Sequence, residues 1–312
     1  MPNGPSRNPD PGRPLAGRPV GRRRLLTYAG LAALGAAAAG CGSSGSASGP
    51  SQTRPRARPV SRQESAVTRT EQVYSEHRRT MVELFFAYPS GVETTQGLPV
   101  VLYLHGRDGL RPTPVPFGTL DSLEKVYGRG TVPPFGFVGV DGGFNPYWND
   151  GSANGDLLSM LTEEVPGWLR SRGLGDEQGL PFAAGGLSTG GFGALNYTIE
   201  RERAGTPLSA LSLLSPALPT TWEQMREKGA FATEQQWQQY DPLQRVGELG
   251  DVPLGVWIGK SDYFFEGTKQ LVDQHPNTPV FETVPGGHEP AVFDSVGDGT
   301  IDFLAGSVPQ SS

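Results

Sequence analysis

The stretch that decides the fold is Ala184-Gly185-Gly186-Leu187-Ser188-Thr189-Gly190-Gly191-Phe192-Gly193. It contains the pattern Gly186-x-Ser188-x-Gly190, which is typical of a nucleophile elbow, a tight turn that carries a serine between a strand and a helix. Glycines are needed there because the serine holds a strained backbone, and a side chain two residues away would clash with the helix or a neighbouring strand. The apolar residues 180–184 predict the strand, and residues 192–200 predict the helix.

Strand-like and helix-like patterns alternate along most of the chain, which predicts an α/β fold. The continuous apolar run at 98–104 is typical of a central strand that is buried on both faces. Other strands are expected at 80–88, 135–140, 210–214, 253–258 and 278–284, and helices at 119–127, 156–172, 267–275 and 291–304. Such alternation indicates a mostly parallel central sheet with helices on both faces, and a helical insertion is expected after the sixth strand, at 220–248.

The position of Ser188 defines which partners it needs. A serine nucleophile requires a histidine base and a carboxylate that orients the histidine, here in the chain order serine, acid, histidine. Ligand chemistry in a parallel sheet lies at the carboxyl ends of the strands, and among the four histidines only His288 follows the serine at such an end. Asp262, in the loop after the strand at 253–258, is the predicted acid, with Glu266 as the weaker alternative. The structural alternatives are a packing role for His288 and a helix N-cap role for Asp262.

An ester carbonyl that is attacked by serine develops a negative charge, which two backbone N–H groups must stabilise. The N–H of Thr189, directly after the nucleophile, is the first predicted donor. The second should come from the loop at 104–109, where Gly106 lets the backbone turn. Arg107 is the predicted second donor, and the sequence does not separate its N–H from that of Asp108.

Four motifs together resemble the esterase D group of α/β-hydrolases, which is related to feruloyl esterases and to the mycolyltransferases of mycobacterial envelopes. They are Leu104-His105-Gly106, Gly186-x-Ser188-x-Gly190-Gly191, Gly259-x-x-Asp262 and Gly287-His288. The resemblance covers residues 81–304 and implies the α/β-hydrolase fold.

The segment Asp141-Gly142-Gly143-Phe144-x-x-Tyr147-Trp148 resembles the loop beside the active site in that group. The resemblance implies that His105, Tyr147 and Trp148 contact the substrate. Asp262 stands where the mycolyltransferases use Glu, which favours a hydrolase. Glu289 follows the histidine where an aromatic residue is common in the group, so the packing around the substrate is expected to differ there.

These features predict a serine esterase that hydrolyses carboxylic esters through an acyl-enzyme, with no cofactor. The Asp-, Asn- and Gly-rich residues 141–156 lack the spacing of a calcium loop, so no metal site is predicted and the segment is interpreted as turn-forming. Two alternatives stay open, an envelope acyltransferase that passes the acyl group to a sugar hydroxyl and a catalytically silent envelope-binding protein. The apolar residues of the insertion form either an acyl-binding cap or ordinary packing: Trp222, Met225, Phe231, Trp237 and Tyr240.

Residues 1–41 are interpreted as an export signal. Arg22-Arg23-Arg24-Leu25-Leu26 precedes an uncharged run at 27–40 that is too short to span a bilayer, and the paired arginines resemble a twin-arginine signal. Ala38-Ala39-Gly40-Cys41 resembles the lipobox of bacterial lipoproteins, with Ala38 where Leu is usual. The resemblance implies that Cys41, the only cysteine, carries a lipid anchor to the outer face of a membrane. Cleavage nearby by an ordinary signal peptidase would instead release a secreted enzyme.

Residues 42–70 are rich in Ser, Gly, Pro and Arg, which predicts a flexible tether. The arginines favour contact with an anionic membrane, although a solvated linker without a partner fits equally well. Residues 71–312 are long enough for one catalytic domain. Residues 70–312 hold 15 Lys and Arg against 30 Asp and Glu, which argues against nucleic acid or a polyanion as a partner.

Overall fold

The computed structural model describes residues 65–110, 113–130 and 132–309. The predicted export signal, Cys41 and most of the predicted tether lie outside these residues. None of the helices in the described ranges is long and apolar enough to cross a membrane.

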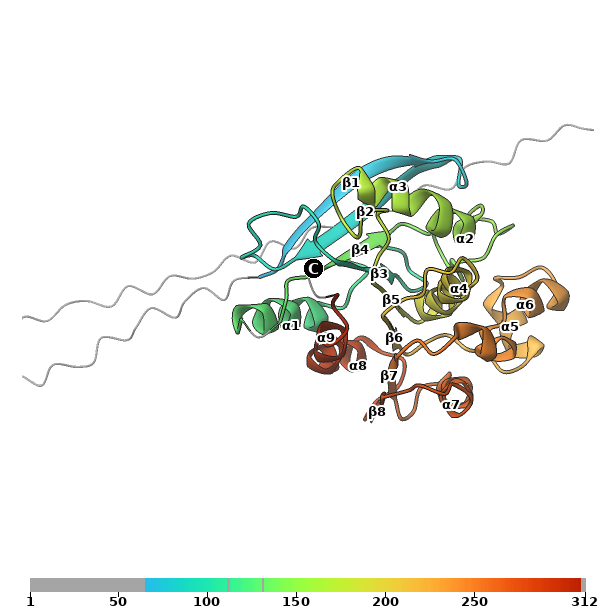
Figure 1. Cartoon of the computed structure of the whole chain (residues 1–312). Coiled ribbons are helices and arrows are strands. Elements are labelled where there is room, and N and C mark those ends of the chain that lie inside the picture. The colour runs from blue at the N-terminus through green and yellow to red at the C-terminus, as the bar shows by residue number, and fades with distance from the viewer. Residues whose placement is uncertain (1–64, 111–112, 131, 310–312) are drawn as a thin grey trace, which may run out of the picture. The chain divides into compact units, whose positions relative to one another are not determined.

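Eight strands in the described part of the chain form one sheet (Figure 1), in the order β1-β2-β4-β3-β5-β6-β7-β8. Their bounds are β1 Val67–Ser75, β2 Thr80–Tyr88, β3 Val100–Leu104, β4 Gly136–Val140, β5 Ala183–Leu187, β6 Ala210–Leu214, β7 Leu254–Gly259 and β8 Val280–Val284. Strand β2 is antiparallel to both β1 and β4, and all the other pairs are parallel. The mostly parallel sheet predicted from the alternation is therefore confirmed.

The strand before the elbow lies further along the chain than predicted. Strand β5 begins at Ala183 and continues through the glycine pair to Leu187. Its partners lie close on both sides, because Gly186 pairs with Leu104 of β3 and with Leu213 of β6. A Cβ added to Gly185 would lie 2.9 Å from the carbonyl oxygen of Ser212. Gly185 and Gly186 therefore belong to the strand rather than to the turn. Glycine is needed at these positions because the neighbouring backbones approach closely.

Strand β1 was not predicted. It pairs with β2 along its whole length, from Val67 opposite Tyr88 to Ser75 opposite Thr80. Most of its residues are polar, and most are exposed, so it lacks the apolar alternation by which strands are recognised. Residues 67–70, which were assigned to the predicted tether, therefore belong to the sheet.

Helices cover both faces of the sheet, with α1, α8 and α9 on one side and α2 to α6 on the other (Figure 1). Their bounds are α1 Phe117–Gly128, α2 Leu157–Ser159, α3 Val165–Arg170, α4 Thr189–Arg203, α5 Trp222–Lys228, α6 Glu234–Tyr240, α7 Phe265–Gln274, α8 Pro290–Ser295 and α9 Gly297–Ala305. The helix predicted at 156–172 is interrupted by a π-helical turn at Met160–Glu164. The helix predicted at 291–304 is divided at Val296 into α8 and α9. The start of α9 lies so close to α1 that a Cβ on Gly297 would overlap the backbone of Gly118.

The side chains of β3 alternate between two cores. Val100, Leu102 and Leu104 pack beneath α4, whereas Val101 and Tyr103 pack beneath α1 and α9. All five residues of β3 are buried. The prediction of a central strand buried on both faces is therefore confirmed, and its carboxyl end lies in the middle of the sheet beside that of β5.

The insertion predicted after the sixth strand follows β6. It contains α5, α6 and the 3₁₀ turns Pro242–Gln244 and Val246–Leu249. Its Met225, Phe231 and Trp237 are buried in the main core, and Trp222 stacks on Trp237 with the ring centroids 6.2 Å apart. The apolar residues of the insertion are therefore ordinary packing rather than the lining of an acyl-binding cap.

Candidate active site

Ser188 occupies the turn between β5 and α4 with a strained backbone, at φ 55° and ψ −117°. Two of the elbow glycines are required by space, because a Cβ on Gly186 would overlap the backbone of Gly190, and one on Gly190 would overlap the carbonyl of Leu104. Backbone hydrogen bonds on both sides of Ser188 hold the turn. The N–H of Ser188 donates to the Leu214 carbonyl, and the Ser188 carbonyl accepts from the N–H groups of Gly191 and Ala217. Strain of about 1–3 kcal/mol is thus maintained by the surrounding structure.

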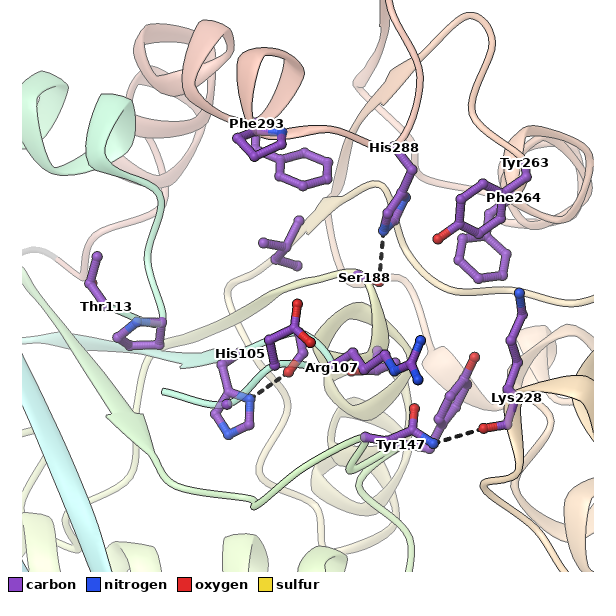
Figure 2. A pocket seen from close by; sticks show the side chains of 18 of the residues that line it. His105, Arg107, Thr113, Tyr147, Ser188, Lys228, Tyr263, Phe264, His288 and Phe293 are labelled. Carbon is purple, nitrogen blue, oxygen red and sulfur yellow. Dashed lines mark hydrogen bonds between the residues drawn. The ribbon is translucent and has the colours of Figure 1, made fainter. Parts of the chain in front are cut away.

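Three side chains that are far apart in the sequence form one hydrogen-bonded line. The Nε2 atom of His288 lies 2.9 Å from Oγ of Ser188 (Figure 2). The Nδ1 atom of His288 lies 2.8 Å from Oδ2 of Asp262. A neutral imidazole that donates from Nδ1 to the carboxylate accepts the serine hydroxyl proton at Nε2. The structure thus brings together the serine, histidine and acid that were chosen from chain order.

Asp262 is held by a second hydrogen bond, because its Oδ1 accepts the N–H of Phe264 over 2.9 Å. Its side chain is completely buried. One carboxylate oxygen therefore holds the loop before α7, while the other orients His288. Asp262 is not the N-cap of α7, because Phe264 occupies that position. Glu266, the weaker alternative acid, lies in the first turn of α7 and makes no hydrogen bond to His288 within the described ranges.

Aromatic rings surround the imidazole of His288. Tyr263, Phe264 and Phe293 lie with their ring centroids 4.8, 5.4 and 5.2 Å from that of His288. None of these rings was predicted, although two of them directly follow Asp262 in the sequence. Phe293, from α8, supplies the aromatic contact that the residue after the histidine does not provide.

The loop after β3 approaches the nucleophile closely at Gly106. A Cβ on this glycine would lie 3.5 Å from Cβ of Ser188 and 3.4 Å from the carbonyl of Leu187. The N–H groups of Arg107 and Thr189 donate no hydrogen bond to any described residue, so both are available to a ligand oxygen. Thr189 is also the first residue of α4, where the helix dipole favours negative charge. The N–H of Asp108 is likewise without an acceptor within the described ranges, so hydrogen bonding does not separate it from Arg107.

His105 and Trp148, predicted to contact the substrate, are buried with exposed fractions of 1% and 0%. The Nδ1 atom of His105 lies 2.7 Å from the Gly106 carbonyl, while its Nε2 accepts the N–H of Gly142 over 2.8 Å. Burial lowers the pKa of His105, so the ring is neutral. The indole of Trp148 packs against His105 and donates to its carbonyl over 3.3 Å. Both side chains therefore help to position the loops after β3 and β4.

A cavity of about 580 Å³ opens beside Ser188 and His288. Of the three residues predicted to contact the substrate, Tyr147 and His105 line this cavity and Trp148 does not. The insertion contributes Lys228, which no sequence motif had indicated. Within the described ranges, no group of three or more His, Cys, Asp or Glu side chains is arranged to hold a metal ion.

The sequence and the fold were compared with known proteins. The family model described as "Putative esterase" matches residues 75–270. No curated protein matches the sequence. Among solved structures, a ferulic acid esterase is 20% identical with a TM-score of 0.63, over 79% of this chain and all of that one. An S-formylglutathione hydrolase from Agrobacterium tumefaciens is 16% identical with a TM-score of 0.62, over 78% of this chain and 96% of the other.

MPT51 of Mycobacterium tuberculosis is a third similar structure. It is 16% identical with a TM-score of 0.59, over 78% of this chain and 100% of that chain. At such identities the likenesses concern the fold alone, and they confirm the predicted α/β-hydrolase architecture.

Proposed function

Since this chain belongs to the family described as "Putative esterase" and is a carboxylic ester hydrolase, we propose that it is a serine esterase with Ser188, His288 and Asp262 as its catalytic triad. The observation that carries the proposal is the unbroken line of two hydrogen bonds, 2.8 and 2.9 Å long, from Asp262 through His288 to Ser188. The line ends at a cavity with room for a small-molecule ester. The substrate class is therefore a small carboxylic ester.

In the first half of the reaction, His288 Nε2 accepts the proton of the Ser188 hydroxyl as Oγ attacks the ester carbonyl carbon. The carbonyl oxygen becomes negatively charged and is stabilised by the N–H groups of Thr189 and Arg107. When this tetrahedral intermediate collapses, the bond to the leaving oxygen breaks and His288 gives the proton to the departing alcohol. The acyl group remains on Ser188.

In the second half, water takes the place of the alcohol. His288 accepts a proton from the water, whose oxygen attacks the acyl carbon. The second tetrahedral intermediate releases the carboxylic acid, and the proton on His288 returns to Ser188. Asp262 keeps its charge throughout, holds His288 in the tautomer that accepts at Nε2, and stabilises the imidazolium that forms in each half.

We also propose that the enzyme works outside the cytoplasm. The support is in the sequence alone: paired arginines, a short apolar run and a lipobox-like Cys41 precede the catalytic domain. Two or more acyl chains at Cys41 would make release from the membrane slow, because each buried CH₂ contributes about 0.8 kcal/mol. The residues up to 66 would let the acidic domain reach esters in the cell envelope.

Labelling with a fluorophosphonate tests the catalytic proposal. The protein without residues 1–41 should react at Ser188, and Ser188→Ala should not be labelled. Folded protein that neither reacts with the probe nor hydrolyses a short aryl ester would contradict the enzyme proposal and favour the envelope-binding alternative.

A further inference from the structure

One side of the catalytic cavity contains a tyrosine hydroxyl without a partner in the described part of the chain. Tyr147 is 1% exposed and lines the cavity. Its ring is fixed by edge-to-face contacts with Phe192 and Phe231, at centroid distances of 5.1 and 6.0 Å. Its hydroxyl makes no hydrogen bond to any described residue. The hydroxyl is therefore available to a ligand in the cavity.

Two cationic side chains line the same cavity, and neither has a carboxylate partner within the described ranges. The guanidinium of Arg107 lies over the ring of Phe144, 5.1 Å from its centroid. The ammonium of Lys228 lies 4.9 Å from the centroid of Tyr263. Both charges thus rest on aromatic rings, which orient a cation but leave its hydrogen-bond donors free.

These groups converge on one region next to the nucleophile (Figure 2). Burial raises the pKa of both Tyr147 and Tyr263, and the nearby positive charge of Arg107 opposes that increase at each hydroxyl. Each tyrosine therefore keeps its proton near neutral pH. Two neutral hydroxyls, a guanidinium and an ammonium then present hydrogen-bond donors to the same space.

The cavity also contains two carboxylates, those of Asp108 and Glu227. Both residues are exposed, and neither forms an ion pair with Arg107 or Lys228. They add negative charge to the cavity lining without pairing with either cation. The domain as a whole is acidic, whereas the cavity lining carries two cations against two carboxylates.

We propose that this donor cluster, Arg107, Tyr147, Lys228 and Tyr263, binds a carboxylate carried by the ester substrate, in addition to the ester group that Ser188 attacks. The inference rests on the proposed esterase function and defines its substrate class as esters with one free carboxylate. A carboxylate has two oxygens that accept several hydrogen bonds, which matches a cluster of donors. The negative charge of the domain disfavours a polyanion, whereas the positive charges of Arg107 and Lys228 favour an anion. A ligand with a single anionic group satisfies both conditions.

Two matched pairs of esters test the inference. With the carboxylate on the acyl side, 1-naphthyl hydrogen succinate is compared with 1-naphthyl methyl succinate, by release of naphthol. With the carboxylate on the leaving group, 4-acetoxybenzoic acid is compared with its methyl ester. The measured quantity is the kcat/KM of the anionic ester divided by that of its neutral partner. When this ratio is compared between variants, the intrinsic reactivity of each ester cancels.

Lys228→Met and Tyr147→Phe should each lower the ratio about tenfold for the pair that places its carboxylate in the cluster, a typical effect of losing a hydrogen bond to a charged group. Lys228→Arg should retain most of the ratio. Lys269→Met is the matched control, since Lys269 pairs with Asp273 on α7 and does not line the cavity, and it should leave the ratio unchanged.

The outcomes separate this inference from the proposed function. Wild-type protein that hydrolyses the neutral esters in a Ser188-dependent way, but whose ratio is unchanged by both Lys228→Met and Tyr147→Phe for both pairs, overturns the inference and leaves the esterase function intact. An equal decrease of the ratio in Lys269→Met would also overturn the inference, because the preference for anionic esters would then follow the total charge of the protein. No Ser188-dependent hydrolysis of any of the four esters would contradict the proposed function itself.

Discussion

The backbone N–H of Gly142 donates a hydrogen bond to Nε2 of His105 over 2.8 Å, which joins the loop after β4 to the loop after β3. The other ring nitrogen of His105 lies 2.7 Å from the carbonyl of Gly106. The imidazole thus fixes the backbone immediately before Arg107, whose N–H is the proposed second donor to the oxyanion. A neutral, buried histidine is therefore a positioning residue for the catalytic loop.

His105→Gln should reveal this buried histidine in the pH dependence of stability. Burial lowers the folded pKa of His105 below its unfolded value, so its stabilising contribution is complete above about pH 6.5 and is lost as the pH falls toward the folded pKa. The free energy of unfolding of the wild type should exceed that of the variant at pH 7. The difference should shrink toward pH 5, by at most about 1.4 kcal/mol per pH unit. Urea unfolding at pH 7, 6 and 5 measures it, and a constant difference would contradict a neutral His105.

Ser188→Ala and His288→Ala should each lower kcat for a short aryl ester by about 10⁴-fold or more, because the members of a triad act as a unit. Combining the two substitutions should therefore cost little beyond either one. Thermal unfolding should show that the single variants stay folded. A multiplicative loss in the double variant would mean that the two residues act independently.

Asp262→Asn should be less damaging than removal of the serine, yet should still lower kcat by roughly 10²–10⁴-fold, since an amide favours the wrong tautomer of His288. Glu266→Gln serves as the matched control, because Glu266 makes no hydrogen bond to His288 within the described ranges. Steady-state kinetics on one aryl ester compare the two. The acid would be misassigned if Glu266→Gln were the more damaging change.

Ser188→Gly should be more stable than Ser188→Ala, although both are inactive. The φ of 55° at this position is strained for alanine and accessible to glycine, so the expected difference in the free energy of unfolding is about 1 kcal/mol. For a domain of this size that corresponds to a Tm about 2–4 °C higher. Calorimetry of the two variants decides, and an equal or lower Tm for Ser188→Gly would show that the elbow is not strained.

Cys41→Ser tests the proposed attachment to a membrane outside the cytoplasm. Replacing the sulfur removes the atom that would carry the lipid, so the protein should move from the membrane fraction to the medium. Fractionation followed by immunodetection measures the distribution. A wild type that is already in the medium would exclude lipid anchoring while remaining compatible with export.

The sequence by itself determined the elements whose signals are local. The elbow at Ser188 is recognisable because its glycines recur at fixed positions around the serine, and the turn itself requires Gly186, whose Cβ would overlap Gly190. Asp262 and His288 could be selected because chain order and strand ends restrict where partners of the serine can lie. The buried strands could be recognised because their apolar runs contrast with the polar loops around them.

Only the tertiary structure decided the features that depend on what lies opposite a residue. Strand β1 exists because β2 offers it a partner, and its own polar side chains carry no strand pattern. His105 and Trp148 occur in motifs that resemble substrate loops, yet they are buried because the loops after β3 and β4 close over them. Tyr147 and Lys228 line one cavity although some 80 residues separate them in the sequence. Burial, strand pairing and the convergence of loops at one edge of a sheet are long-range properties, which the local composition of a segment does not encode.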